Sequence, residues 1–176
     1  CSPTCERRTT ISSNGLTAGR LIATQLVALL LIAACTGIQT PEGWSGAAVG
    51  TDRLFIGTME GDVRALDLET GRTDWIFPLR GEEGNRAVYG TPALGENGDL
   101  VFVGGYDGRL YALSTDNGKD EWETIVGAGS PIVGGPVVAG GLVLVGSSDG
   151  NLYAYSAAEG AFEWRFPTGH MVWSAP

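Results

Sequence analysis

The sequence has little histidine, little cysteine and few basic residues. Its single histidine is His170, and its three cysteines are Cys1, Cys5 and Cys35. The spacing of these residues does not match a metal site, because Cys1 and Cys5 have no further Cys or His beside them. The chain has 11 lysines and arginines against 20 acidic residues, a formal charge of −9. This shortage of basic surface argues against a nucleic-acid partner, whose phosphates need neutralising. We therefore predict no metal site and no nucleic-acid partner.

The sequence also lacks an apolar run long enough to cross a membrane comfortably. Its longest run, Leu21–Ala34, has 14 residues, whereas a membrane-spanning helix needs about 20. Arg20 precedes this run and Cys35 follows it. A short apolar core after a basic residue is typical of an export signal. Ile32-Ala33-Ala34-Cys35 resembles the cleavage box of bacterial lipoproteins, in which small residues precede a cysteine that receives the lipid.

This resemblance implies cleavage after Ala34 and lipidation of Cys35. We predict a signal peptide over residues 1–34 and a lipidated cysteine with a short tether over residues 35–45. A buried helix that happens to end at a cysteine is the alternative. The polar stretch 1–19 is unusually long for a signal peptide, so we expect translation to begin near Leu16.

Glycine, by contrast, is abundant, with 28 residues, and the later part of the chain repeats itself. Three similar segments span residues 54–75, 101–122 and 143–164, and each ends in a tryptophan. These tryptophans, Trp75, Trp122 and Trp164, recur 47 and then 42 residues apart. A period near 40 residues built from strand-like runs predicts stacked β-units.

The second copy illustrates the expected fold of each unit. Residues 100–103 and 110–113 are short runs rich in strand formers, separated by Asp107-Gly108. Asp-Gly favours the tight turn of a hairpin. A second turn at 116–118 leads to a strand with Trp122, and residues 91–94 add one strand before the unit. Four-stranded meanders of this kind pack around an axis as the blades of a β-propeller.

The fold class predicted is therefore all-β, a propeller of four-stranded antiparallel blades. Radial closure needs about four to eight blades, and the resemblance of these repeats to a known propeller family implies seven or eight in full. About three are present, so we predict that the chain is a fragment, with closure by oligomerisation as the alternative. The predicted segments are blade repeat 1 at 46–78, an insertion at 79–88, blade repeat 2 at 89–123, blade repeat 3 at 132–167 and the start of a fourth blade at 172–176.

The repeated pattern resembles the pyrroloquinoline-quinone-type propeller repeat over Gly46–Pro176, roughly three quarters of the chain. The resemblance implies that each tryptophan packs against the glycine-containing peptide of its own blade and links neighbouring blades. The docking positions so identified are Trp75, Trp122, Trp164, Gly71, Gly118 and Gly160.

Few residues suggest chemistry. Asp107 and Asp149 recur at the first turn of their blades, with Glu60 at the equivalent place. Residues that occur once per blade build the blade, so we assign these acids to turn structure. The turn positions are Gly61, Asp107, Gly108, Asp149 and Gly150. His170 has no nucleophile or acid at catalytic spacing, which favours a surface position. We predict no catalytic residue, although the sequence leaves an enzymatic role open.

Three functions fit these observations. The favoured one is a non-enzymatic, lipid-anchored scaffold that binds envelope proteins without a cofactor, similar to the BamB lipoproteins of outer-membrane assembly. It would lie on the periplasmic face of the outer membrane or on the cell surface. The second is a quinoprotein dehydrogenase, for which the resemblance implies pyrroloquinoline quinone (PQQ) and calcium. The family's adjacent-cysteine pair is missing from these blades. The third is an envelope propeller that senses a ligand.

Overall fold

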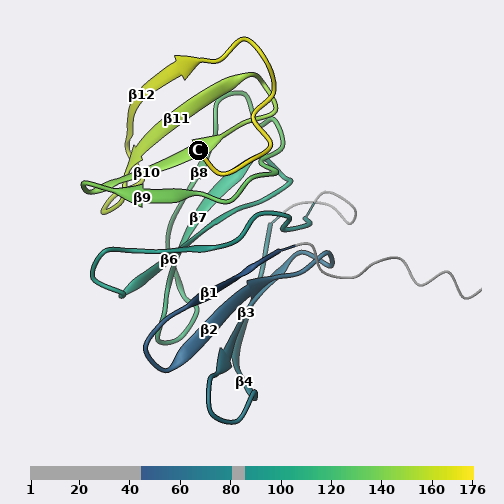
Figure 1. Cartoon of the computed structure of the whole chain (residues 1–176), viewed down its shortest axis with the longest axis vertical. Coiled ribbons are helices and arrows are strands. Elements are labelled where there is room, and N and C mark those ends of the chain that lie inside the picture. Colours follow the sequence, from purple (N-terminus) through teal and green to yellow (C-terminus); the bar gives the residue numbers. More distant parts are fainter. Residues whose placement is uncertain (1–44, 81–85) are drawn as a thin grey trace, which may run out of the picture. The chain divides into compact units, whose positions relative to one another are not determined.

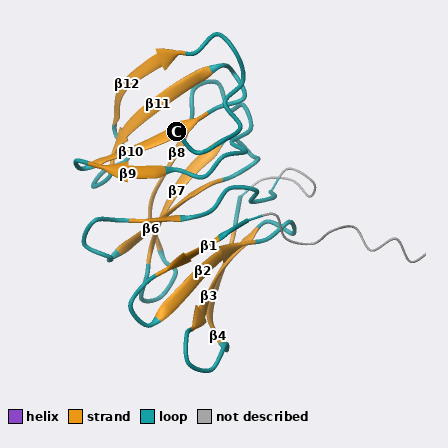
Figure 2. Cartoon of the chain, viewed as in Figure 1, coloured by secondary structure: helices purple, strands orange, loops and turns teal. Residues whose placement is uncertain are grey.

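A computed structural model describes residues 45–80 and 86–176. All of these residues belong to one compact unit, Pro41–Pro176. Figure 2 shows strands joined by loops throughout this part of the chain. The strands form three separate four-stranded antiparallel sheets. The predicted all-β fold with three four-stranded blades is therefore confirmed. A search of the described residues found no helix with the length and apolar character needed to span a bilayer.

Each sheet is built from consecutive strands of one repeat, as Figure 1 shows by their colours. Blade 1 comprises β1 (Ala47–Val49), β2 (Arg53–Gly57), β3 (Asp62–Asp67) and β4 (Thr73–Pro78). Blade 2 comprises β5 (Ala93–Leu94), β6 (Leu100–Gly104), β7 (Arg109–Ser114) and β8 (Asp120–Ile125). Blade 3 comprises β9 (Val137–Ala139), β10 (Leu142–Gly146), β11 (Asn151–Ser156) and β12 (Phe162–Pro167).

The core lies between successive blades, and the alternation of side chains along blade 2 explains why. Val101, Val103 and Leu113 belong to the apolar cluster shared with blade 1. Phe102 and Ala112, one residue along from these, belong to the cluster shared with blade 3. Since successive side chains of a strand point to opposite faces, one strand pair serves two interfaces. Blade 2 is consequently buried on both faces.

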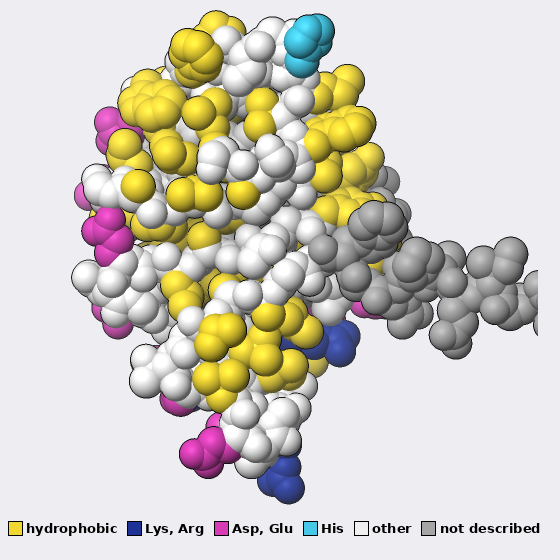
Figure 3. Space-filling view, viewed as in Figure 1, with side chains coloured by type: hydrophobic (Ala, Val, Ile, Leu, Met, Phe, Trp, Pro, Cys, Tyr) yellow, Lys and Arg dark blue, Asp and Glu magenta, His cyan; other side chains and the backbone are white. Residues whose placement is uncertain are grey.

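Blade 3 differs, because its outer strand is exposed along its whole length. Figure 3 shows apolar side chains on the surface over this blade. Its exposed apolar residues include Phe162, Trp164 and Phe166. After β12 the backbone repeats the path that it takes after the earlier blades. Val172 N–H donates to Ser147 O at 3.1 Å, as Val88 N–H does to Thr58 O at 2.9 Å.

A β-bulge precedes the tryptophan in every blade. In blade 3 the register shifts between Ala154 and Tyr155, which pair with Trp164 and Phe162 respectively. Shifts at the equivalent places occur in blades 1 and 2. The extra residue changes which face the following side chains occupy. The tryptophan and the residue two positions before it therefore lie on opposite faces of the blade.

Candidate functional site

The predicted docking tryptophans join successive blades. The Trp75 indole Nε1 donates to the carbonyl oxygen of Thr115 at 3.0 Å. A Cβ placed on Gly118 would lie 2.4 Å from Trp75 Cε3, so the ring lies flat against the glycine backbone. Gly118 also has a φ of +70°, which glycine adopts without strain. The same contact recurs one blade later, where Trp122 packs on Gly160 and donates to Ala157 O at 3.1 Å.

These contacts correct one expectation. The glycine under each indole belongs to the following blade and not to the tryptophan's own blade. Gly71, which shares a repeat with Trp75, has nothing within 4 Å of the place where its Cβ would stand. The reason is the bulge, which turns the indole out of its own sheet toward the next one. The third tryptophan, Trp164, has no following blade among the described residues and is 40% exposed.

We predict that Trp75→Ala lowers the free energy of unfolding by about 3–5 kcal/mol. This indole is 9% exposed and makes both docking contacts. Trp164→Ala is the matched control, and we expect a loss of about 0.5 kcal/mol, as at a surface site. Equilibrium denaturation of both variants measures the difference. Equal losses would contradict a stabilising role for the contact between blades.

The recurring aspartates each accept a hydrogen bond from a tyrosine four residues later. Tyr111 Oη donates to Asp107 Oδ2 at 2.5 Å, and Tyr153 Oη donates to Asp149 Oδ2 at 2.6 Å. The Tyr111 hydroxyl also accepts the backbone N–H of Arg80, at 3.1 Å, from the link that leaves blade 1. The pair in blade 2 therefore fastens the turn of one blade to the exit of the preceding blade.

The sequence predicted the acids but not their tyrosine partners. A signal was available, since tyrosine follows Asp-Gly at the same spacing in blades 2 and 3. Blade 1 has Glu60 and Arg64 at these two positions. There Arg64 Nη2 pairs instead with Asp62 Oδ2 at 3.0 Å. The same turn is thus held by an ion pair in one blade and by a tyrosine–carboxylate pair in the others.

The two tyrosine-bound carboxyls have pKa values shifted in opposite directions. Burial raises the pKa of Asp107 above the ordinary 3.8, and the hydrogen bond from Tyr111 only partly offsets this. Burial also favours a higher pKa for Asp149. There, however, hydrogen bonds from Tyr153 and Asn151 outweigh burial and lower the pKa below 3.8. Asp107 is thus the easier of the two to protonate.

These directions predict opposite effects of acid on stability. Ionised Asp149 stabilises the fold above pH 3.8, and this contribution is lost as the pH falls through its lowered folded-state pKa. The contribution of Asp107 decreases as the pH rises from 3.8 through its raised folded-state pKa. Carboxyl ¹³C chemical shifts followed against pH should give a higher midpoint for Asp107 than for Asp149. The reverse order would contradict the assignment.

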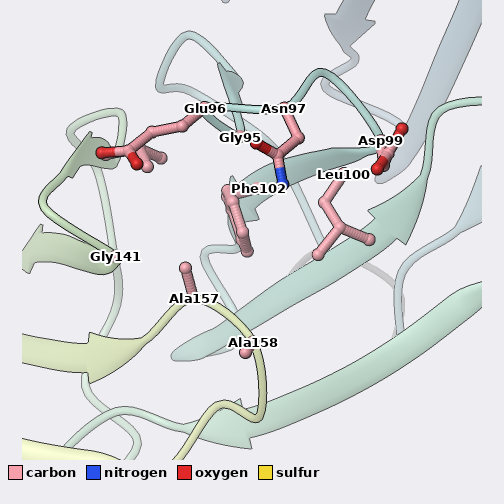
Figure 4. A pocket seen from close by; sticks show the side chains of 10 residues that line it. Gly95, Glu96, Asn97, Asp99, Leu100, Phe102, Gly141, Ala157 and Ala158 are labelled. Atoms are coloured by element: carbon pink, nitrogen blue, oxygen red, sulfur yellow. The ribbon is translucent and has the colours of Figure 1, made fainter.

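A cavity of about 310 Å³ opens between blades 2 and 3 beside the docked Trp122. Its floor is apolar and includes Leu100, Phe102 and Val138. Figure 4 shows Glu96 at its rim, extended toward the loop that carries Gly141. Glu96 Oε1 accepts the backbone N–H of Gly140 at 2.8 Å, which ties blade 2 to blade 3 across the opening. The cavity suits a small apolar group.

The candidate metal ligands among the described residues are dispersed. Within 45–80 and 86–176, no three His, Cys, Asp or Glu side chains gather where they could share a metal ion. His170 lies on the exposed link after β12. The predicted lipidation site Cys35 and the cleavage position after Ala34 lie outside the described residues, as do residues 81–85 of the predicted insertion at 79–88.

Comparison with known proteins gives one family match. The family of the outer membrane protein assembly factor BamB matches residues 36–166. BamB of Xanthomonas campestris pv. campestris is 33% identical over 100 residues, which cover 52% of this chain and 24% of that protein. The quinoprotein ethanol dehydrogenase of Pseudomonas aeruginosa is 29% identical over 87 residues, or 44% of this chain and 14% of that enzyme.

Solved structures share the fold. BamB from Moraxella catarrhalis superposes with a TM-score of 0.60 at 24% identity, covering 70% of this chain and 37% of that structure. Quinohemoprotein alcohol dehydrogenase from Comamonas testosteroni gives a TM-score of 0.57 at 25% identity, covering 70% of this chain and 21% of the enzyme. The chain therefore spans well under half the length of these relatives.

Proposed function

Since the chain belongs to the family of the outer membrane protein assembly factor BamB, we propose that it is a non-enzymatic scaffold that binds other envelope proteins. Outer-membrane protein assembly is the process that this membership favours. The observation that carries the proposal is that the recurring carboxylates are already engaged by hydrogen bonds within the fold. The carboxylates of Asp107 and Asp149 each accept a hydrogen bond from a tyrosine of their own blade, and one of these tyrosines, Tyr111, also accepts the backbone N–H of Arg80 from the preceding link.

The shape of the described blades also supports binding. Rigid sheets joined by buried indoles leave indentations at their seams, such as the cavity lined by Leu100 and Phe102. Such seams bring side chains from two blades to one surface, where a segment of a partner protein can be held. The formal charge of −9 agrees with a protein partner better than with a nucleic acid.

The second candidate is a PQQ- and calcium-dependent dehydrogenase, which the similarity to quinoprotein ethanol dehydrogenase favours. The described residues do not fit that cofactor pair. The part of the chain seen here has no group of three or more candidate metal ligands, and the repeat region has no cysteine. We therefore derive no reaction through PQQ or calcium and prefer the scaffold.

The scaffold role is tested by co-purification. The full chain, tagged at its C-terminus and produced in the envelope of a two-membrane bacterium, should retain the outer-membrane protein assembly machinery. It should not reduce an artificial dye with ethanol after incubation with PQQ and Ca²⁺. An unrelated lipoprotein with the same tag is the control. Failure to retain assembly proteins, together with ethanol-dependent dye reduction, would replace the scaffold with the dehydrogenase.

The membrane anchor is proposed at Cys35. Cells grown with an alkyne-labelled fatty acid should label the chain, and the mature protein should begin at Cys35. Cys35→Ser should abolish both the label and the cleavage, because the thiol is the lipid acceptor. Thr36→Ser, next to the lipid acceptor, is the control and should change neither. A lipid label that persists in the Cys35→Ser variant would rule out this anchor.

A further inference from the structure

An open groove of about 650 Å³ lies between the end of blade 2 and the outer half of blade 3. One wall includes Ile125 and Gly127, at the end of β8 and in the link that follows it. The other wall includes Tyr155, Phe162 and Arg165, from β11 and β12. We name this feature the β8–β12 groove. It is formed by the face of blade 3 that looks toward blade 2.

The same seam one blade earlier is filled by the protein itself. There the side chain of Arg80, from the link after blade 1, lies over blade 2. Its Nη2 pairs with Asp120 Oδ2 at 3.0 Å and its Nε with Glu123 Oε2 at 2.8 Å. The first seam thus holds a cation against two carboxylates of β8.

At the second seam these three positions have changed together. By the 47- and 42-residue spacings of the repeat, Gly127 takes the place of Arg80, Phe162 that of Asp120 and Arg165 that of Glu123. The strand registers support the match, since Tyr111 pairs with Glu123 and Tyr153 pairs with Arg165. The filling side chain is absent and the charge facing it is reversed.

Arg165 lies beside the Tyr153 hydroxyl in this groove. It forms no ion pair with any residue in 45–80 or 86–176, whereas the matching Glu123 pairs with both Arg80 and Arg109. The carboxylate that lines the groove, Asp149, already accepts hydrogen bonds from Tyr153 and Asn151. The groove thus holds one carboxylate engaged by hydrogen bonds and one guanidinium, Arg165, that no ion pair occupies among the described residues.

Aromatic rings stand beside this charge. The bulge of blade 3 places Phe162 on the same face as Arg165. The Phe162 ring contacts Tyr155 edge-on, with 6.0 Å between the ring centroids. Phe162 is 56% exposed, and Ile125 across the groove is 52% exposed. A ligand thus meets a guanidinium next to apolar surface.

We propose that the β8–β12 groove binds a segment of a partner protein in which a carboxylate side chain neighbours an apolar one. The carboxylate pairs with Arg165, whose planar fork suits two parallel hydrogen bonds. The apolar side chain packs between Phe162 and Ile125. This inference rests on the proposed scaffold function, for which it names a surface and a partner chemistry. Trp164 lies on the opposite face of the blade, so its side chain takes no part in the groove.

The test uses a short peptide as the probe. Acetyl-Phe-Glu-Leu-amide is titrated into the ¹⁵N-labelled full chain, and the Arg165 Nε and Asn151 side-chain NMR signals are followed. We expect saturable shifts, with binding at least about tenfold tighter than for the matched Gln peptide, the change that loss of a charge-assisted contact of about 1.4 kcal/mol produces. Arg165→Glu should abolish binding. Arg72→Glu should leave binding unchanged, since it makes the same change of charge at an exposed turn of blade 1.

Several outcomes would overturn the inference. Equal affinity for the Glu and Gln peptides would remove the role of the charge, and so would undiminished binding by the Arg165→Glu variant in a folded chain. If acetate alone bound as tightly as the peptide, the site would be a small-anion site and not a peptide groove. Phe162→Ala gives a second test. It should lower the affinity for the peptide severalfold and leave the affinity for acetate unchanged. Peptide binding without co-purification of assembly proteins would reject the assembly role and leave the groove standing.

Discussion

The contact of an indole with the glycine of the next blade is the interaction on which the rest of this structure depends. A four-stranded sheet of this size cannot bury either face alone, so each blade needs a neighbour. The indole contributes both a packing contact and a hydrogen bond to the seam between two blades. Its ring packs on a glycine backbone, where a Cβ would clash with the ring, and its N–H donates to a carbonyl oxygen at the same edge. Blade 2, with neighbours on both sides, shows the result: its two inner strands are almost entirely buried.

A second layer of contacts fixes how the chain passes from blade to blade. The hydroxyl of Tyr111 joins the turn carboxylate of its own blade to the backbone of the preceding link. These polar groups are partly buried, and a buried group without a partner costs stability. These hydrogen bonds therefore act mainly by positioning the link between blades, which they hold at a fixed place over the sheet. The residue at this point of the link decides whether a seam is filled, as by Arg80, or left open, as beside Gly127.

Much of this fold could be predicted from the sequence, because strands, Asp-Gly turns and a fixed period are local signals. The period predicted the blade count and the strands within each copy. It could not say which glycine lies under each tryptophan, because Gly71 and Gly118 occupy the same place in successive copies. Only the bulge before Trp75, a property of the paired strands, separates the two. The tyrosine partners of Asp107 and Asp149 were not predicted, because turn chemistry alone does not extend to the strand beyond the turn. The β8–β12 groove was not predicted either, because it arises from three residues that are distant in sequence and meet only across a seam.

The blades of a repeat protein can be compared with one another. This comparison separates the residues that build the fold from the residues that can bind a partner. Positions with the same role in successive blades, such as the docked Trp75 and Trp122 and the turn glycines, contribute to the fold wherever they occur. Positions where the two seams differ have no such role in the fold. The change from Arg80 to Gly127 removes the cation that the chain itself supplies to the first seam, and the change from Glu123 to Arg165 reverses the charge that faced it. Neither disturbs the strand pairing, since both seams keep the same register. Such paired differences change what a seam can bind without changing how the blades stack. Binding sites for partners of this protein are therefore best sought at positions where the residues of the two seams differ.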